Sequence, residues 1–168
     1  MKRIKLFVFL LLLCSACFSD SLIDFLGVPF NADIKMSVKI LRDKGFFVED
    51  IDVFQSEYND SFQTIIQFKS TDTVDYHTLN VIRVWLYFDF NELSFIQSTV
   101  YVPDYMKFEK SLLEKYPYLE CSSRKLTGRA SPIYKDKLSK AEISTSAACD
   151  HKYSCNGSEI IMSISKRH

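Results

Sequence analysis

The sequence predicts an α+β fold: an antiparallel sheet, made of a strand meander and a C-terminal hairpin, with two helices packed on one face. The expected order is α-β-β-β-α-β-β. Two segments have apolar residues at helical spacing, and the runs between and after them are rich in β-branched and aromatic residues. With 47% hydrophobic residues and only four glycines and four prolines in 168 residues, the chain can bury one core and is not linker-rich.

Residues 1–19 are predicted to be a secretory signal peptide. A basic start precedes an apolar run from Leu6 to Leu13, and small residues follow it. The run is shorter than the roughly 20 apolar residues of a membrane span, although an uncleaved anchor helix is the alternative. We expect cleavage near residues 16–19, one exported domain over 20–168 and no transmembrane helix in the mature chain.

Cys17 raises a second possibility for the N-terminus. Cys14-Ser15-Ala16-Cys17 resembles a degenerate bacterial lipobox, in which the cysteine is acylated after cleavage, but Cys14 stands where leucine is usual. Ordinary signal peptidase could instead cut after Ala16 or Ser19. The sequence therefore predicts either a periplasmic protein or an envelope lipoprotein anchored through Cys17, and secretion also stays open.

The charge balance gives no support for nucleic-acid binding. Three of the 21 Lys and Arg residues lie in the predicted signal peptide, which leaves 18 basic against 21 acidic residues. The mature chain is thus mildly acidic, whereas nucleic-acid binding domains are typically basic.

The first helix is expected between Asn31 and Gly45. Asn31 is a plausible N-cap, Asp33 would lie in the first turn, and Gly45 can adopt the left-handed conformation that ends a helix. Its apolar stripe comprises Ile34, Met36, Val38, Ile40 and Leu41.

Three strands should form the meander. They are predicted over 62–69, 80–89 and 93–102, and the central one is apolar on one face throughout. The preceding acidic segment, 46–60, is interpreted as a short strand or an irregular crossing.

The second helix should span Tyr105 to Tyr116, with Asp104 as its cap and Pro117 after its end. Residues 122–140 are then interpreted as an unusually long loop, and such loops are often functional. The last two strands are expected over 142–148 and 159–165.

These features resemble a group of small, poorly characterised exported bacterial proteins. In that group a Phe-x-Gly-Ile/Val-Pro-Phe turn leads into a helix ending in Lys-Gly-Phe, and a strand meander and a second amphipathic helix follow. The matching residues are Phe25, Gly27, Val28, Pro29, Phe30, Lys44, Gly45, Phe46, Phe108, Leu112, Lys115 and Tyr116. The sequence departs from the pattern at 31–33 and at Pro117. The resemblance implies a fold and a compartment, and no catalytic residues.

Cys149 and Cys155 are the disulfide candidates. They flank five residues of the predicted C-terminal hairpin, and an exported protein meets oxidising conditions. Cys121 would be left free or exchange as partner. The alternative is a metal site from Cys149, Asp150, His151 and Cys155, but zinc knuckles usually come in pairs, so no metal or other cofactor is expected.

The expected loop 122–140 is strongly basic and could bind an anionic surface or partner. Its basic residues are Arg124, Lys125, Arg129, Lys135, Lys137 and Lys140. The alternative is a solvated loop without a partner. The acidic segment 49–60 offers a complementary surface, so self-association is a further possibility.

No catalytic motif is present, and function is therefore predicted only by class. Asp72, Asp75 and His77 could do acid–base work, but we expect them to lie in a solvated loop. The first hypothesis is a non-enzymatic binding or structural module of the cell envelope, acting on an unknown envelope protein or anionic surface. The rival is a small periplasmic hydrolase that uses carboxylates with His77 or His151.

Overall fold

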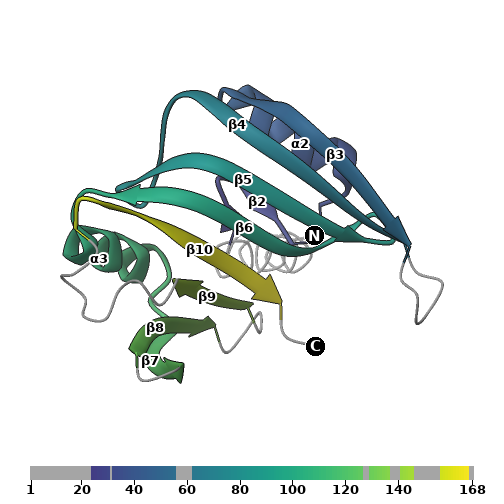
Figure 1. Ribbon diagram of the computed structural model, residues 1–168. Coiled ribbons are helices and arrows are strands. Elements are labelled where there is room, and N and C mark those ends of the chain that lie inside the picture. Colours follow the sequence, from purple (N-terminus) through teal and green to yellow (C-terminus); the bar gives the residue numbers. More distant parts are fainter. Residues whose placement is uncertain are drawn as a thin grey trace, which may run out of the picture.

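Most of the molecule is one eight-stranded antiparallel sheet, accompanied by two helices and a two-stranded hairpin (Figure 1). The computed structural model describes residues 24–30, 32–55, 62–126, 129–136, 141–145 and 156–166, without the side chains of 123–131 and 166. The elements in chain order are β1 (Asp24–Phe25), β2 (Val28–Pro29), α2 (Ile34–Asp43), β3 (Phe46–Gln55), β4 (Phe62–Tyr76), β5 (Leu79–Asp89), β6 (Glu92–Val102), α3 (Tyr105–Lys115), β7 (Leu119–Leu126), β8 (Arg129–Asp136), β9 (Ala141–Thr145) and β10 (Ser158–Lys166).

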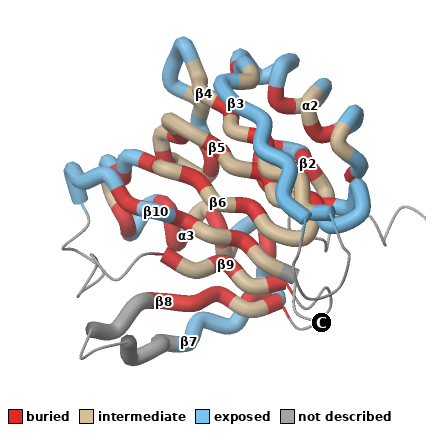
Figure 2. Tube along the Cα trace, turned by 45° about the vertical axis from the view of Figure 1, so that its right-hand side comes forward, coloured by how far each residue is buried: buried red, intermediate tan, exposed pale blue. Residues whose placement is uncertain are grey.

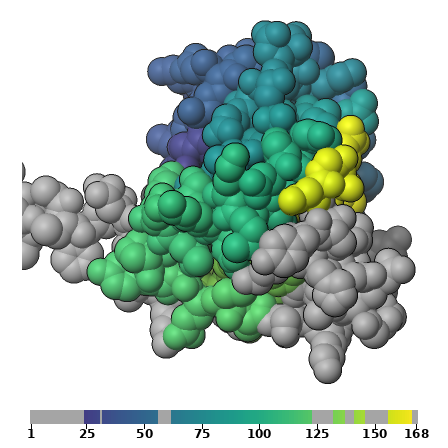
Figure 3. Space-filling view, turned by 90° about the vertical axis from the view of Figure 1, so that its left-hand side faces the viewer, coloured from purple at the N-terminus to yellow at the C-terminus, as the bar shows by residue number. Residues whose placement is uncertain are grey.

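The sheet has an approximate internal twofold arrangement. Its strand order is β3-β4-β5-β6-β10-β9-β8-β7, so that each half is a helix followed by a four-stranded meander, and the last strands of the two meanders pair in the middle. The helices also correspond: the capping residues Asp33 and Asp104 and the buried residues Leu41 and Leu112 are each 71 positions apart. Figure 3 shows the first half, in purple to teal, above the green α3 and β7.

The predicted meander and the C-terminal hairpin are confirmed, but the predicted order was incomplete. The expected loop over 122–140 contains most of β7 together with β8, which pair from Leu119↔Asp136 to Leu126↔Arg129. Polar residues hide this hairpin in the sequence, and its pairing with β9 places Tyr134 in the core. Residues 46–55 of the acidic segment likewise form a ten-residue strand, β3, with one irregularity between Val48 and Asp50.

The loop expected around Asp72, Asp75 and His77 is also mostly strand. β4 continues through an irregularity between Lys69 and Val74 and ends at Tyr76. The strand pattern was missed because polar residues occupy this irregularity. Val74 and Tyr76 resume the apolar alternation, and Tyr76 is buried.

The caps correct one detail of the first helix. The N-cap of α2 is Asp33, whose Oδ1 accepts a hydrogen bond from the Met36 N–H at 2.7 Å, whereas Asn31 lies outside the described residues. Both residue types can cap, and the backbone path decides between them. Met36 is 51% exposed and does not belong to the packed face. Gly45 adopts φ +88° after the helix, as expected, and Asp104 caps α3.

One continuous core joins these elements. The buried strand residues alternate with partly exposed ones, as in β5, where Val84, Leu86 and Phe88 have no exposed surface (Figure 2). Leu41 of α2 and Leu112 of α3 belong to the same cluster. Because the two helices and the sheet share this cluster, either helix should contribute to the stability of the whole domain.

Leu41→Ala should lower the free energy of unfolding by about 2–5 kcal/mol, because it leaves a cavity at a site with no exposed surface. Met36→Ala, on the exposed side of the same helix, is the matched control and should change it by roughly 0.5 kcal/mol or less. Urea unfolding of both variants measures the difference. Equal effects of the two substitutions would contradict the described orientation of α2.

Candidate functional site

The sheet has a face opposite its buried residues, which we call the outer face. Trp85 lies on it between Gln67 of β4 and Gln97 of β6, its neighbours in register. The Trp85 Nε1–H donates to Gln67 Oε1 at 3.1 Å. These side chains are partly exposed, whereas Val84 and Leu86 on either side of Trp85 point into the core.

A second row of the outer face adds two aromatic rings. Tyr87 and Phe95 are cross-strand partners, and their ring centroids lie 5.1 Å apart in an edge-to-face arrangement. The Tyr87 hydroxyl donates to Gln97 Oε1 at 3.1 Å. Burial raises the pKa of Tyr87, so the hydroxyl stays protonated and remains a donor. The hydrogen bonds thus fix an aromatic and amide surface across three strands.

Charged residues lie next to this surface on β3, and others lie beyond β10 in the second half of the sheet. Glu49 of β3 accepts a hydrogen bond from the Gln67 amide and lies 3.7 Å from Arg83. In the second half, Lys135 of β8 stands in register between Glu120 of β7 and Glu142 of β9. A basic residue between two acidic neighbours presents much less net positive charge than the sequence pattern indicated.

The other predicted site residues are only partly placed. Arg124, Lys125 and Arg129 belong to the β7–β8 hairpin, where only the backbone is described. Cys17, Lys137, Lys140, Cys149, His151 and Cys155 lie outside the described residues. Cys121 lies exposed on β7. The disulfide, the acylation and the anionic-partner patch therefore stay predictions.

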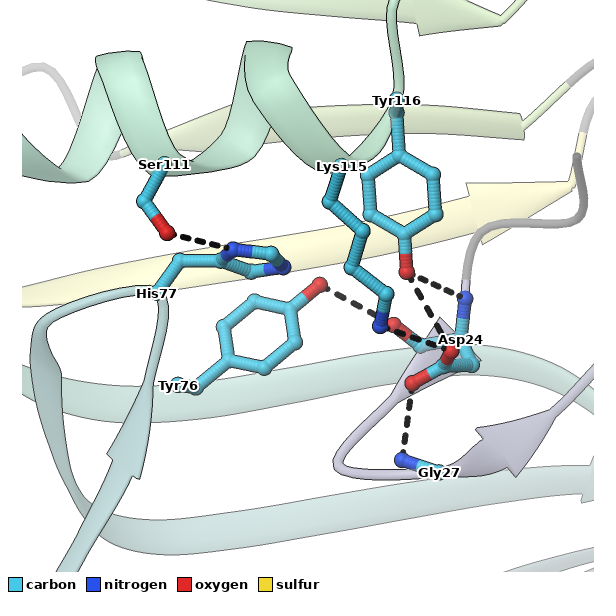
Figure 4. A network of polar contacts seen from close by, with 7 residues as sticks. All are labelled: Asp24, Gly27, Tyr76, His77, Ser111, Lys115 and Tyr116. Atoms are coloured by element: carbon cyan, nitrogen blue, oxygen red, sulfur yellow. Dashed lines mark hydrogen bonds and ion pairs between the residues drawn. The ribbon is translucent and has the colours of Figure 1, made fainter. Parts of the chain in front are cut away.

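A polar cluster joins the N-terminal hairpin, the β4–β5 turn and α3 (Figure 4). Asp24 is at its centre. One carboxylate oxygen, Oδ2, lies 3.0 Å from Lys115 Nζ and 3.3 Å from the Tyr116 hydroxyl, and the other accepts from the Gly27 N–H at 2.8 Å. The Tyr76 hydroxyl donates to the Asp24 carbonyl oxygen at 3.0 Å. These contacts hold β1 against the C-terminal end of α3.

His77 lies at the edge of this cluster. Its Nδ1 is 3.1 Å from Ser111 Oγ of α3, and its ring packs edge-on against Tyr76 with centroids 4.6 Å apart. Burial lowers the pKa of His77, and the nearby Lys115 ammonium lowers it further, against the smaller opposing effects of Asp24, Asp75 and the hydrogen bond with Ser111. The imidazole is therefore held in its neutral form.

The pKa values of Tyr76, Tyr116 and Lys115 are raised, so these three groups keep their protons. Burial raises the pKa of Tyr76 well above its usual value and also raises that of Tyr116. Burial alone would lower the pKa of Lys115, but its hydrogen bonds to Tyr116 and Asp24 outweigh this effect and raise it. Lys115 thus remains a cation beside the carboxylate of Asp24.

The turn at His77 is strained. His77 and Thr78 have φ of +52° and +69°, values that suit glycine or asparagine better than a β-branched residue. In addition, the Thr78 Oγ1 is buried with no hydrogen-bond partner among the described residues. Such strain costs on the order of 1–3 kcal/mol and persists where the surroundings hold the backbone in place. Here Ser111 and the ring of Tyr76 hold it.

The cluster could do limited chemistry. A serine hydroxyl beside a neutral histidine is the first half of a nucleophile–base pair, but in a triad a carboxylate orients the histidine from its other nitrogen. Among the described contacts, no carboxylate bonds the remaining ring nitrogen of His77. Two open grooves of about 530 and 300 Å³ lie elsewhere, along α2 and beside the β4 irregularity.

Neither a metal centre nor a membrane helix is found in the described part of the chain. Over the described ranges, no group of three or more His, Cys, Asp and Glu side chains is placed to hold a metal ion. None of the helices within these ranges is both long enough and apolar enough to cross a membrane.

Comparisons of the chain with protein-family models, curated proteins and solved structures found no match. The resemblance described from the sequence therefore stays a prediction.

Sequence reasoning missed Asp24 and Lys115, which are 91 positions apart and carry no local signal of their pairing. It placed Trp85 and Tyr87 only within the predicted strand 80–89 and did not single them out. The alternation of β5 did indicate their common face, but it did not indicate that the residues of this face are partly exposed.

The stability of the protein should fall as the pH drops below about 6.5. The pKa of His77 is lower in the folded than in the unfolded chain, so protonation favours the unfolded state. His77→Gln should make this decrease smaller, because glutamine can retain a hydrogen bond to Ser111 without titrating.

Urea unfolding between pH 5 and pH 8 measures the effect (the range is about 1.5 units on either side of the ordinary histidine pKa). His168→Gln, which removes a histidine far from this cluster in the sequence, is the control. If the two variants show the same pH dependence, His77 is not the titrating group.

Proposed function

We propose that this chain is a non-enzymatic binding module of a bacterial cell envelope, and that it binds a partner protein through the outer face of its sheet. The observation that carries the proposal is the surface formed by Gln67, Trp85, Tyr87, Phe95 and Gln97. The proposal includes the packing of both helices on the same face of the sheet. The outer face is then left as a broad binding surface.

The chemistry of the outer face supports a protein partner. Aromatic residues are enriched in interfaces, because one ring supplies a large contact area with few rotatable bonds. The hydrogen bonds of Trp85 and Tyr87 to glutamines fix these rings before any partner arrives. A fixed surface loses less conformational entropy on binding than a mobile one.

The location in the envelope rests on the N-terminal sequence. We propose export by the signal peptide 1–19, with Cys17 either acylated or left unmodified near the cleavage site. The polar cluster fixes Asp24 to α3, so a chain anchored at Cys17 would be attached to the folded domain at a defined point. Six residues separate Cys17 from Asp24. An extended chain of that length spans roughly 20 Å, so an acylated protein would be held close to its membrane.

A photo-cross-linking residue at Gln97 should yield a discrete cross-linked protein in the intact envelope. The same residue at Lys39, exposed on α2, is the control and should yield none. Adding Trp85→Ala and Tyr87→Ala should reduce the Gln97 product by about tenfold or more, since aromatic residues at the centre of an interface often contribute 2 kcal/mol or more.

Thermal unfolding checks that these variants remain folded. Equal cross-linking from Gln97 and Lys39 would contradict the outer-face proposal, and so would a Gln97 product that both alanine substitutions leave unchanged.

The second candidate is a hydrolase, and the contact between His77 and Ser111 favours it. His77 would act as the base and Ser111 as the nucleophile, with the partly exposed Asp24 and Lys115 as the polar surroundings. If so, Ser111→Ala should abolish hydrolysis of activated esters and leave cross-linking at Gln97 unchanged. Ester hydrolysis that is absent from the unmodified protein, or equal in both proteins, would exclude this candidate.

A further inference from the structure

The eight-stranded sheet has two edges, β3 and β7. Among the described strands, β3 pairs only with β4, and β7 pairs only with β8. Each edge therefore presents backbone N–H and C=O groups that can pair with another strand.

The β3 edge is long and apolar for an exposed strand. It has ten residues, of which Ile51, Val53 and Phe54 are 55%, 63% and 52% exposed. Phe62, at the start of the neighbouring β4, is 53% exposed and lies in register with Gln55. Natural proteins usually shorten or protect such edges, so an exposed apolar edge of this length indicates an interaction surface.

The two edges carry opposite charge. β3 contains Glu49, Asp50 and Asp52 and no basic residue. β7 contains Arg124 and Lys125 beside a single acidic residue, Glu120, and Arg129 begins the next strand. Like charges on paired strands are destabilising. Pairing of β3 with a second β3 is therefore opposed by charge, whereas pairing of β3 with β7 of another copy is favoured.

Strand direction is compatible with this pairing. Seven antiparallel pairings separate β3 from β7 across the sheet, and because this number is odd, the two edge strands run in opposite directions. Consider a second copy that is translated within the plane of the sheet, perpendicular to the strands, without rotation. Its β7 lies antiparallel to β3 of the first copy. Antiparallel pairing is the slightly more stable kind.

We propose that copies of this chain associate head to tail, with β7 of one copy pairing to β3 of the next and continuing the sheet. The Ile51 N–H already donates to the Asp50 carboxylate at 2.9 Å and is therefore not available to a new strand. We place the pairing at residues 52–55 of β3 for this reason. The contact is heterologous, so it can add further copies at both ends. It leaves the outer face of every copy available, and its failure would not affect the proposal made for that face.

Sedimentation velocity of the full chain as exported tests the association. The average mass should rise with protein concentration at 50 mM salt, and the association should weaken about tenfold at 500 mM, because salt screens the attraction between acidic and basic edges. Runs with and without a reductant separate strand pairing from disulfides between copies. A monomer at all concentrations would overturn the proposal.

Charge-reversal variants distinguish head-to-tail pairing from the pairing of two β3 edges or of two β7 edges. Asp50→Lys with Asp52→Lys makes both edges basic, and Arg124→Glu with Lys125→Glu makes both edges acidic. Each double variant alone should be monomeric, and an equal mixture of the two should associate again, since acidic and basic edges then meet.

Lys39→Glu, a charge reversal on the exposed side of α2, is the matched control and should associate like the unmodified protein. If the β7 variant alone still associates, the copies do not use that edge. If the mixture stays monomeric while both variants are folded by circular dichroism, head-to-tail pairing is wrong.

Discussion

The pairing of β6 with β10 is the contact on which the rest of the structure depends. Eight residue pairs, from Ser158↔Val102 to Ser165↔Phe95, join two four-stranded meanders into one sheet. The start of β10 is fixed twice: the Gly157 N–H donates to the Val102 carbonyl at 2.7 Å, and Asn156 Oδ1 accepts from the Tyr105 N–H at 2.8 Å. One turn thereby aligns both the central strands and the beginning of α3. Without this pairing, each half would have a further open edge and an incomplete core.

In the second half of the molecule, hydrogen bonds of buried hydroxyl groups join α3 to β8. The first half has an apolar residue at the corresponding position of α2. The Tyr134 hydroxyl donates to Glu109 Oε1 at 3.1 Å and lies 3.0 Å from the hydroxyl of Tyr105. Burial raises the pKa of Tyr105 to about 12, and the pKa of Tyr134 rises further for the same reason, so both remain neutral hydrogen-bonding groups. In α2 the position that corresponds to Glu109 is Val38, an apolar residue packed on the core. The two halves thus share a topology but use different interactions to hold their helices.

The sequence predicted best those elements whose signal is local. The alternation of β5 and the cap of α3 depend on neighbouring residues, and both were confirmed. The β7–β8 hairpin was missed because a polar run such as 122–131 carries no apolar periodicity, and the pairing of β8 with β9 that attaches the hairpin to the sheet leaves no local signal. The Asp24–Lys115 contact was missed for a related reason: only the folded chain brings β1 to the end of α3. Of the candidate site, the residue types and the common face of Trp85 and Tyr87 were visible in the sequence, but their neighbours on β4 and β6 were not.

The physical character of the two candidate regions also supports the proposal of binding over the proposal of hydrolysis. In the polar cluster, the charges and hydroxyls satisfy one another: Asp24 has Lys115, Tyr116 and the Gly27 N–H, and little capacity is left for a substrate. On the outer face the arrangement is different, because Trp85 and Tyr87 use only their single polar hydrogens and keep their ring surfaces for another molecule. The cluster is therefore suited to holding the chain together, and the outer face is suited to recognition. A one-sided core makes this division possible, since a sheet that is buried on one face can vary the other without loss of its fold.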